Sequence, residues 1–506
     1  MTSSGSSDAR SPSTSRSVPA SKAAGAVRRG PGLGHALKRW LYLIHRWIGI
    51  GSCILFAMWF ASGLVMIYVP YPSLSQGEWL ARAQPIDWAR VTVAPPIDPA
   101  RTPRQLDLAM RDGSPVWRVQ EWSGERRLVS ADRAVAEPHV NAAYARRVAN
   151  RFGNADVLAV AELERDQWTV AGGFDRHRPL WKVAMADPVK TELYVSSSTG
   201  DIVQSTTRSE RLWNWLGSVP HWIYPTILRQ DQSAWRQTVL WISGPCIAAA
   251  ITGMWIGILR TRVGQRRFKG GRMTPYHGWM LWHHVAGLVG GIFLTLWIFS
   301  GWLSVDPGHL FTSPDPAEGV EQRYSSGKPL PPIDVTRLSQ AAAGARLVSV
   351  SDHAGLPSVT LFGADGARRV LALPSLSPAV PQRSAIEQAA KGLVPAGKLA
   401  DATLLTEPDA YYYDIGAKPR LPALRLRFAD PDRTWLYLDP VTGEVLNGVD
   451  TRRRTYRWLY DMFHKWDLNV LTLNRPLWDI LLWAFSLIGL VTSVSGVWIG
   501  WKRLRR

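Results

Sequence analysis

Four long apolar runs stand out from the mixed polar and apolar pattern of the rest of the chain. The runs, at 47–77, 237–259, 273–305 and 480–501, lack Asp, Glu, Lys and Arg, and each reaches the about 20 residues that an α-helix needs to cross the hydrocarbon core of a bilayer. We therefore predict four transmembrane helices, at residues 38–68, 237–259, 281–304 and 479–501. The predicted fold class is an integral membrane protein with a four-transmembrane-helix bundle in the lipid bilayer.

The chain also contains an internal duplication. The first and third apolar runs share histidine, glycine, tryptophan and serine positions, and a second histidine recurs before the second and fourth runs. The matched residues are His45 with His283, Gly49 with Gly287, Trp59 with Trp297, Ser62 with Ser300, Gly63 with Gly301 and His221 with His464. This pattern predicts two repeats of parallel topology, related by a pseudo-twofold axis along the membrane normal, so that matched residues face each other.

The long segments between the apolar runs predict two outer domains, at 69–210 and 305–453. Each contains alternating apolar and polar residues around a glycine turn, which is typical of a β-hairpin, at 191–203 and 434–446. A short helical pattern covers 384–392. We therefore expect two α+β domains, each followed by an aromatic segment at the membrane interface, at 211–236 and 454–478.

Basic residues are concentrated in three short segments. Residues 1–40 hold seven Lys and Arg against one Asp, the loop 260–280 holds six Lys and Arg with no acid, and the tail 502–506 holds four, so these segments carry +16 of the formal net charge of +19. Such a distribution places both termini and the loop in the cytoplasm and the outer domains on the other side of the membrane, in the periplasm if the cell has two membranes. It also accounts for the basic charge without a nucleic-acid partner. The Ser-, Ala-, Arg- and Gly-rich residues 1–37 are expected to be a disordered tail.

The amino-acid composition indicates the environment of the chain and limits the kinds of metal or cofactor site that it can form. The chain has 26 Trp and only 20% charged residues, which favours a lipid environment. Its two cysteines, Cys53 and Cys246, each stand alone in an apolar run, so a disulfide framework and a cysteine metal cluster are excluded. CxxCH is absent, which excludes the usual covalent attachment of haem.

The duplicated histidines are the candidate ligands of a metal ion or a metal-containing cofactor. His45 and His283 both lie at the cytoplasmic start of a predicted helix, and His221 and His464 both lie in aromatic segments on the other side. Because about 30 Å of hydrocarbon separates these levels, we expect two centres rather than one. His284 is an alternative to its neighbour His283, although the ungapped repeat favours His283.

Two imidazoles are an incomplete shell for zinc but a full axial set for a haem iron. Gly49 and Gly287, one helical turn beyond their histidines, leave room for a flat macrocycle. We therefore predict two bis-histidine haem b groups, with iron on His45 and His283 and on His221 and His464. The alternatives are that the glycines only allow close helix packing and that the histidines are hydrogen-bonded interfacial residues.

These motifs resemble a known family. His45 to Gly49 followed by Trp59-x-x-Ser-Gly63, the copy from His283 to Pro307, and the outer strand-turn segments ending in Thr-Gly-Asp or Thr-Gly-Glu are similar to the PepSY-associated transmembrane proteins. Some members of that family resemble inner-membrane ferric-siderophore reductases. The resemblance implies PepSY-like periplasmic domains and a part in iron uptake.

The resulting hypothesis is an enzyme, a haem-dependent oxidoreductase that reduces a ferric siderophore on the periplasmic side. A cytoplasmic reductase or a quinol is the expected electron donor, because no GxGxxG or flavin-site pattern lies in the short cytoplasmic segments. Two alternatives remain open. One is a cofactor-free siderophore or metal transport accessory, and the other is a PepSY-type regulatory membrane protein.

Overall fold

The structure is a computed structural model that describes residues 33–98, 103–132, 140–317, 319–325, 328–395, 397–413 and 419–506. Most of the tail predicted at 1–37 lies outside these residues, and its last residues already belong to the first helix. Three of the predicted spans are confirmed as continuous helices long and apolar enough to cross a membrane. They are α1 (Leu33–Met66), α7 (Gln232–Leu259) and α16 (Arg475–Leu504).

The remaining predicted span, at 281–304, is not one helix, so the prediction of a four-transmembrane-helix bundle is wrong. The apolar run at 281–304 forms α8 (Gly278–Val289) and α9 (Gly291–Leu303), which are bent by 67°. The break falls at two consecutive glycines that allow close approach of neighbouring helices. A Cβ at Gly290 would lie 2.5 Å from Ile488 Cγ2, and one at Gly291 would lie 3.0 Å from Met254 Cε.

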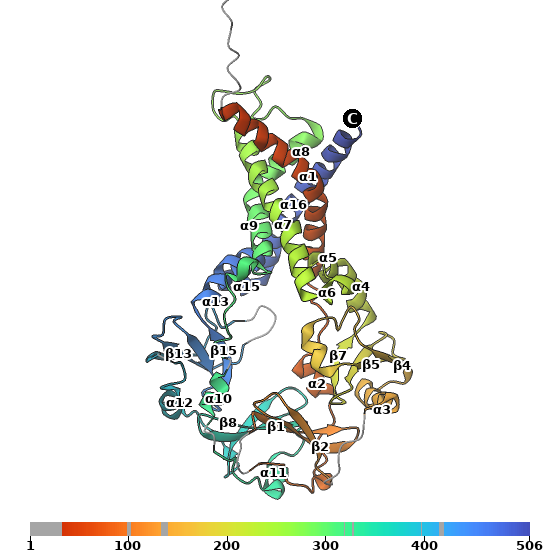
Figure 1. Cartoon of the computed structure of the whole chain (residues 1–506), viewed down its shortest axis with the longest axis vertical. Helices are drawn as coiled ribbons and strands as arrows, with labels where there is room; N and C mark the ends of the chain where they lie inside the picture. Colours follow the sequence, from red (N-terminus) through yellow and green to blue (C-terminus); the bar gives the residue numbers. More distant parts are fainter. Residues whose placement is uncertain are drawn as a thin grey trace, which may run out of the picture.

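The apolar helices pack across the two halves of the chain. The helix α1 contacts α7 and α16, α8 contacts α16, and α9 contacts α7. In Figure 1 these helices cross one another at one end of the molecule, where the C-terminus and α8 lie, and the sheets occupy the other end. Helices of the first half therefore pack directly against helices of the second half.

The β-structure is far more extensive than two isolated hairpins. Three antiparallel sheets form among the described residues, with strand orders β4-β5-β6-β7, β12-β13-β14-β15 and β11-β10-β9-β8-β1-β2-β3. The strands of the first half are β1 (Gln105–Arg111), β2 (Ser114–Gln120), β3 (Arg126–Ser130), β4 (Val157–Leu163), β5 (Leu180–Met185), β6 (Glu192–Ser196) and β7 (Ile202–Thr206). Those of the second half are β8 (Leu347–His353), β9 (Leu356–Phe362), β10 (Arg368–Ala372), β11 (Ser377–Pro378), β12 (Leu399–Leu405), β13 (Ala423–Phe428), β14 (Trp435–Leu438) and β15 (Val445–Val449).

The two predicted hairpins are confirmed as β6 with β7 and β14 with β15. The helical pattern at 384–392 is confirmed as α12 (Arg383–Ala390), and α3 (Ala142–Gly153) is its counterpart before the first four-stranded sheet. The remaining short helices are α2 (Gln76–Arg82), α4 (Arg208–Leu216), α5 (Ser218–His221), α6 (Thr226–Arg229), α10 (Val320–Tyr324), α11 (Val335–Ala341), α13 (Thr451–Tyr456), α14 (Phe463–Lys465) and α15 (Asn469–Thr472). Turns of 3₁₀-helix occupy Trp88–Arg90, Gly172–His177 and Pro307–His309, and a π-helical turn occupies Arg457–Met462.

The seven-stranded sheet joins the two halves far from the apolar helices (Figure 1). Strands β1 and β8 pair antiparallel, and we call this pairing the seam. Asp107 pairs with Ser349, and these are the third residues of the two corresponding strands. The pseudo-twofold axis of the duplication therefore passes between them.

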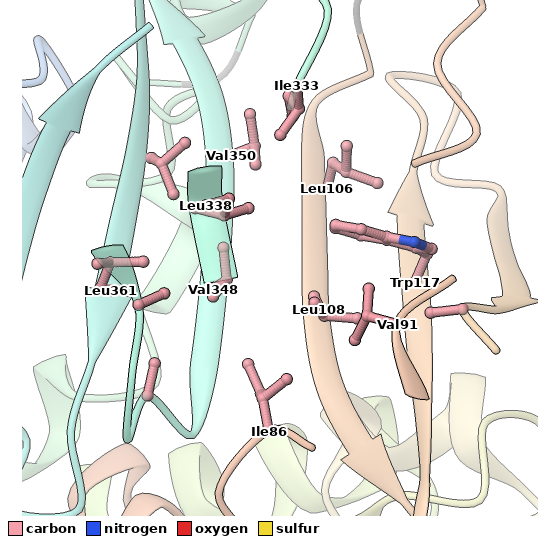
Figure 2. Close-up of a cluster of buried hydrophobic side chains, with 14 of the residues drawn as sticks. Ile86, Val91, Leu106, Leu108, Trp117, Ile333, Leu338, Val348, Val350 and Leu361 are labelled. Atoms are coloured by element: carbon pink, nitrogen blue, oxygen red, sulfur yellow. The ribbon is translucent and has the colours of Figure 1, made fainter. Parts of the chain in front are cut away.

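A shared hydrophobic core covers one face of the seam. Figure 2 shows Leu106 and Leu108 of β1 opposite Val348 and Val350 of β8, with Trp117 of β2 beside them, and all five side chains are fully buried. Because this core takes residues from both halves, neither outer domain has a complete core of its own on this side.

Replacing Leu106 with alanine should destabilise this core. Removal of a fully buried leucine side chain costs about 2–5 kcal/mol, since the cavity left behind fills only in part. The matched control is Leu404→Ala on β12, because the Leu404 side chain is 44% exposed. Urea unfolding followed by tryptophan fluorescence should show a lower midpoint for Leu106→Ala only. Equal midpoints for the two variants would contradict a core at the seam.

Candidate histidine centres

The first histidine pair lies between α1 and α8. The rings of His45 and His283 have centroids 6.2 Å apart and are inclined by 41°. The pairing expected from the duplication is therefore confirmed. Each ring is also in contact with a glycine of a neighbouring helix. A Cβ at Gly253 of α7 would lie 2.6 Å from His45 Cε1, and one at Gly496 of α16 would lie 3.1 Å from His283 Cε1.

Backbone carbonyl groups orient both rings of this pair. The Nδ1 atom of His45 lies 3.0 Å from the carbonyl oxygen of Ala249, and that of His283 lies 2.9 Å from the carbonyl oxygen of Thr492. A carbonyl oxygen only accepts, so Nδ1 carries the proton in both residues. This leaves the lone pair on Nε2, which is the usual arrangement of a histidine that binds a metal.

The second pair lies at the ends of short helices below the membrane region. His221 closes α5 and His464 lies in α14, and their ring centroids are 6.1 Å apart with planes inclined by 68°. This pairing is confirmed as well. Both residues lie outside the spanning helices. Burial lowers the pKa of His221 to about 4, and burial, together with the electrostatic influence of the neighbouring His221 and Lys465, lowers the pKa of His464 to about 3. Both rings are therefore neutral at pH 7.

The repeated Trp-x-x-Ser-Gly motif holds this second pair. The indole Nε1 of Trp59 donates to the carbonyl oxygen of His221, and that of Trp297 donates to the carbonyl oxygen of His464, both at 2.9 Å. Ser300 donates its hydroxyl hydrogen to the carbonyl oxygen of Trp297, so its oxygen accepts from Nδ1 of His464 at 3.1 Å.

Ser62 acts in the same way. Its hydroxyl donates to the carbonyl oxygen of Met58, and its oxygen lies 3.0 Å from Nδ1 of His221. The glycine of each motif leaves space for the ring, because a Cβ at Gly63 or Gly301 would lie 3.3 or 3.4 Å from Cε1 of its histidine. The repeat was visible in the sequence, but its role in orienting a histidine 159 or 164 residues away was not predicted.

The structure separates His284 from His283. The Nε2 atom of His284 lies 3.2 Å from Thr261 Oγ1, and its ring contacts Tyr276 with centroids 5.2 Å apart. His284 therefore faces away from His45. Of the two predicted glycines, Gly49 has open space where a Cβ would be, and Gly287 would meet only Thr492 Cγ2, at 3.5 Å.

The two halves differ around His464. The ring of Tyr460, in the π-helical turn, stacks on His464 with centroids 5.3 Å apart. A buried ion pair between Arg457 and Asp467, 2.8 Å apart, holds the ends of the same segment together. His221 follows a regular helix instead, in which Asn214 donates to the carbonyl oxygen of Pro70. The sequence contained no signal for the π-helical turn.

Each pair brings two imidazole rings together where the halves of a duplicated chain meet. In the part of the chain that the structure describes, no group of three or more His, Cys, Asp or Glu residues is placed to hold a metal ion. The fold and the site thus define a duplicated membrane protein with two histidine pairs. The chain belongs to the family of the PepSY-associated TM region, whose model matches residues 42–355. The family resemblance found in the sequence is confirmed. No curated protein matches the chain.

Proposed function

We propose that this membrane protein is a di-haem electron-transfer protein that reduces a ferric siderophore on the periplasmic side of the bacterial inner membrane. His45 and His283 would hold one haem b, and His221 and His464 would hold the other. The observation that carries the proposal is the spacing of the rings within each pair. The two rings of the first pair lie at nearly the same separation as the two rings of the second, although the backbone segments that carry the pairs differ.

This spacing fits an iron atom between the rings. A metal–imidazole nitrogen bond is about 2.0 Å long and the ring centroid lies roughly 1.1 Å behind that nitrogen, so two opposite ligands place their centroids roughly 6.2 Å apart. The observed separations are 6.2 and 6.1 Å. A direct hydrogen bond between the two Nε2 atoms of a pair would need one of them to carry a proton. In each pair the proton is on Nδ1, which donates to an acceptor, so neither Nε2 can donate.

The two histidines of each pair favour a haem centre that transfers electrons. When bound, a haem supplies one-electron redox chemistry. Two histidine ligands leave no open position on the iron, so the centres are suited to passing electrons rather than to binding oxygen. The Nδ1 hydrogen bonds fix each ring and raise its basicity as a ligand. Buried, neutral imidazoles need no deprotonation before they bind a metal.

The family resemblance and the charge pattern support the proposed substrate and donor. Reduction of Fe³⁺ to Fe²⁺ weakens its binding to the hard oxygen ligands of a siderophore, which releases the iron. With the basic segments and both termini in the cytoplasm, electrons would enter near His45 and His283 from a cytoplasmic reductase or a quinol. They would leave near His221 and His464, on the side of the outer domains.

The test is the absorbance spectrum of the detergent-purified protein. We expect a Soret band, a sharpened α-band after dithionite, and two haems per chain. Anaerobic addition of a ferric siderophore should reoxidise the reduced protein, and a ferrous-specific chromogenic ligand should trap Fe²⁺. A protein without a Soret band after growth with added haem precursor would overturn the proposal and favour a cofactor-free transport accessory or a regulator.

Replacing Ser300 with alanine should weaken haem binding at the second pair. The change removes the acceptor of the Nδ1 hydrogen of His464, and loss of such a partner costs about 10–100-fold in metal affinity. Ser304→Ala is the matched control, because Ser304 caps the same helix one turn later, is exposed, and its hydroxyl donates to the carbonyl oxygen of Gly301. The rate of haem transfer to an apoprotein scavenger measures the effect. Equal rates in both variants would count against a ligand role for His464.

A further inference from the structure

A basic hollow lies in the first outer domain, away from both histidine pairs. It has a volume of about 50 Å³ and lies between the end of α2, the strands β1 and β2, the helix α3 and the β6–β7 turn, which group together in Figure 1. We call it the arginine hollow. Four arginines and two aspartates are among its lining residues, namely Arg82, Arg111, Arg118, Arg151, Asp112 and Asp201.

Aromatic rings hold three of these guanidinium groups in place. Arg82 lies over Phe152 with 5.6 Å between the guanidinium carbon and the ring centroid, Arg118 lies over Trp79 at 5.7 Å, and Arg111 lies over Tyr144 at 5.0 Å. At Arg82 and Arg118 such stacking occupies the face of the guanidinium group and leaves its edge, which carries the N–H donors, for polar partners such as an anion. The hollow is thus lined by donors of fixed direction.

The aspartates do not neutralise the arginines fully. Asp201 pairs with Arg118 at 2.6 Å, while Asp112 is shared between Arg147 at 2.9 Å and Arg151 at 3.7 Å. Within the described residues the guanidinium group of Arg82 forms no ion pair or hydrogen bond and contacts the ring of Phe152. The Nε atom of Arg118 is buried without a hydrogen-bond partner there. The hollow therefore keeps positive charge and a buried donor that a bound anion would satisfy.

The duplication provides an internal comparison. Arg111 ends β1 where His353 ends β8, and Arg118 is the fifth residue of β2 where Thr360 is the fifth of β9. In the second half a tyrosine, Tyr324, lies beside the turn glycine Gly443, and this tyrosine is only 2% exposed. The fold thus forms without these arginines in the second half, so the fold itself does not require them in the first.

We propose that the arginine hollow binds an anionic group, a carboxylate or a phosphate, of a small ligand. A cavity of this size holds only a few water molecules, which suits one such group and not a whole iron chelate. Planar guanidinium groups bind both kinds of anion through paired N–H donors. This site does not depend on haem, and its ligand would bind to the first outer domain only.

Calorimetric titration of the full-length protein in detergent tests the site, with inorganic phosphate in one arm and citrate in the other. We expect saturable binding of at least one anion, weakened by added salt. The anion that binds more tightly shows whether the ligand of the hollow carries a phosphate or a carboxylate. Binding of neither anion would overturn the proposal.

The matched variants change exposed arginines. Arg82→Gln and Arg151→Gln alter the hollow at its rim, while Arg383→Gln alters an exposed arginine of the second outer domain that pairs with Glu387. Each rim substitution should weaken binding about tenfold, the effect of losing about 1.4 kcal/mol. Arg383→Gln should bind as the unchanged protein does. Undiminished binding by a folded Arg82→Gln/Arg151→Gln variant, with an unchanged melting temperature, would overturn the proposal.

Discussion

Replacing His283 with alanine should lower the haem content from two per chain to one and stop reduction of the chelate, while the adjacent His284→Ala should keep both haems. His283 faces His45 across 6.2 Å, whereas His284 is engaged with Thr261 and Tyr276. Loss of an outer partner of a ligand alone costs about 10–100-fold, so loss of the ligand itself should exceed the upper end of that range.

Two measurements follow this prediction. Haem is quantified as its pyridine complex against protein concentration, and Fe²⁺ formation is followed with the chromogenic trap after addition of the electron donor. The second haem should remain in His283→Ala, because His221 and His464 are bound by separate motifs. A His283→Ala protein with two haems, or a His284→Ala protein with one, would contradict the assignment of the first centre.

The pairing of the histidines was predictable because duplication is a property of the sequence alone. Once His45 matched His283 and His221 matched His464, the pseudo-twofold axis required each couple to meet. Hydropathy likewise predicted α1, α7 and α16, since the free energy of burial in lipid depends on composition over a long window. These conclusions needed no knowledge of which surfaces touch.

The bend between α8 and α9 was not predictable in the same way. Hydropathy is blind to backbone geometry, and the uncharged Gly290-Gly291 does not interrupt the apolar run around it. In the first half the matched residues are Ser52 and Cys53, and there α1 continues without a break. The difference depends on Ile488 and Met254, which occupy the space that side chains at the glycines would need.

The seam and the role of the Trp-x-x-Ser-Gly motif also depend on three-dimensional contacts. Nothing in the β1 sequence indicates that its free edge pairs with β8 of the other half, since many strands have the same alternating pattern. Likewise the sequence identifies Trp59 and Ser62 only as repeated positions, and only the structure shows their hydrogen bonds to His221. Sequence reasoning identified the ligand candidates but not the groups that orient them.

Replacing Gly253 with valine should remove the haem of the first pair without changing either histidine. Gly253 lies one helical turn after Ala249, whose carbonyl oxygen accepts from Nδ1 of His45. A Cβ at Gly253 would lie 2.6 Å from Cε1 and 3.0 Å from Nδ1 of that ring. A valine side chain therefore displaces the imidazole from Ala249 and from its position opposite His283.

Gly51→Val is the matched control, because Gly51 lies on α1, is exposed, and has no atom within 4 Å of the position that a Cβ would take. We expect Gly253→Val to retain one haem with the spectrum of the second pair, Gly51→Val to retain two, and Gly253→Val combined with His464→Ala to retain none. Haem content of the three purified variants decides the matter. Two haems in Gly253→Val would show that His45 does not need the position that the structure gives it, and so that contact with α7 does not build the centre.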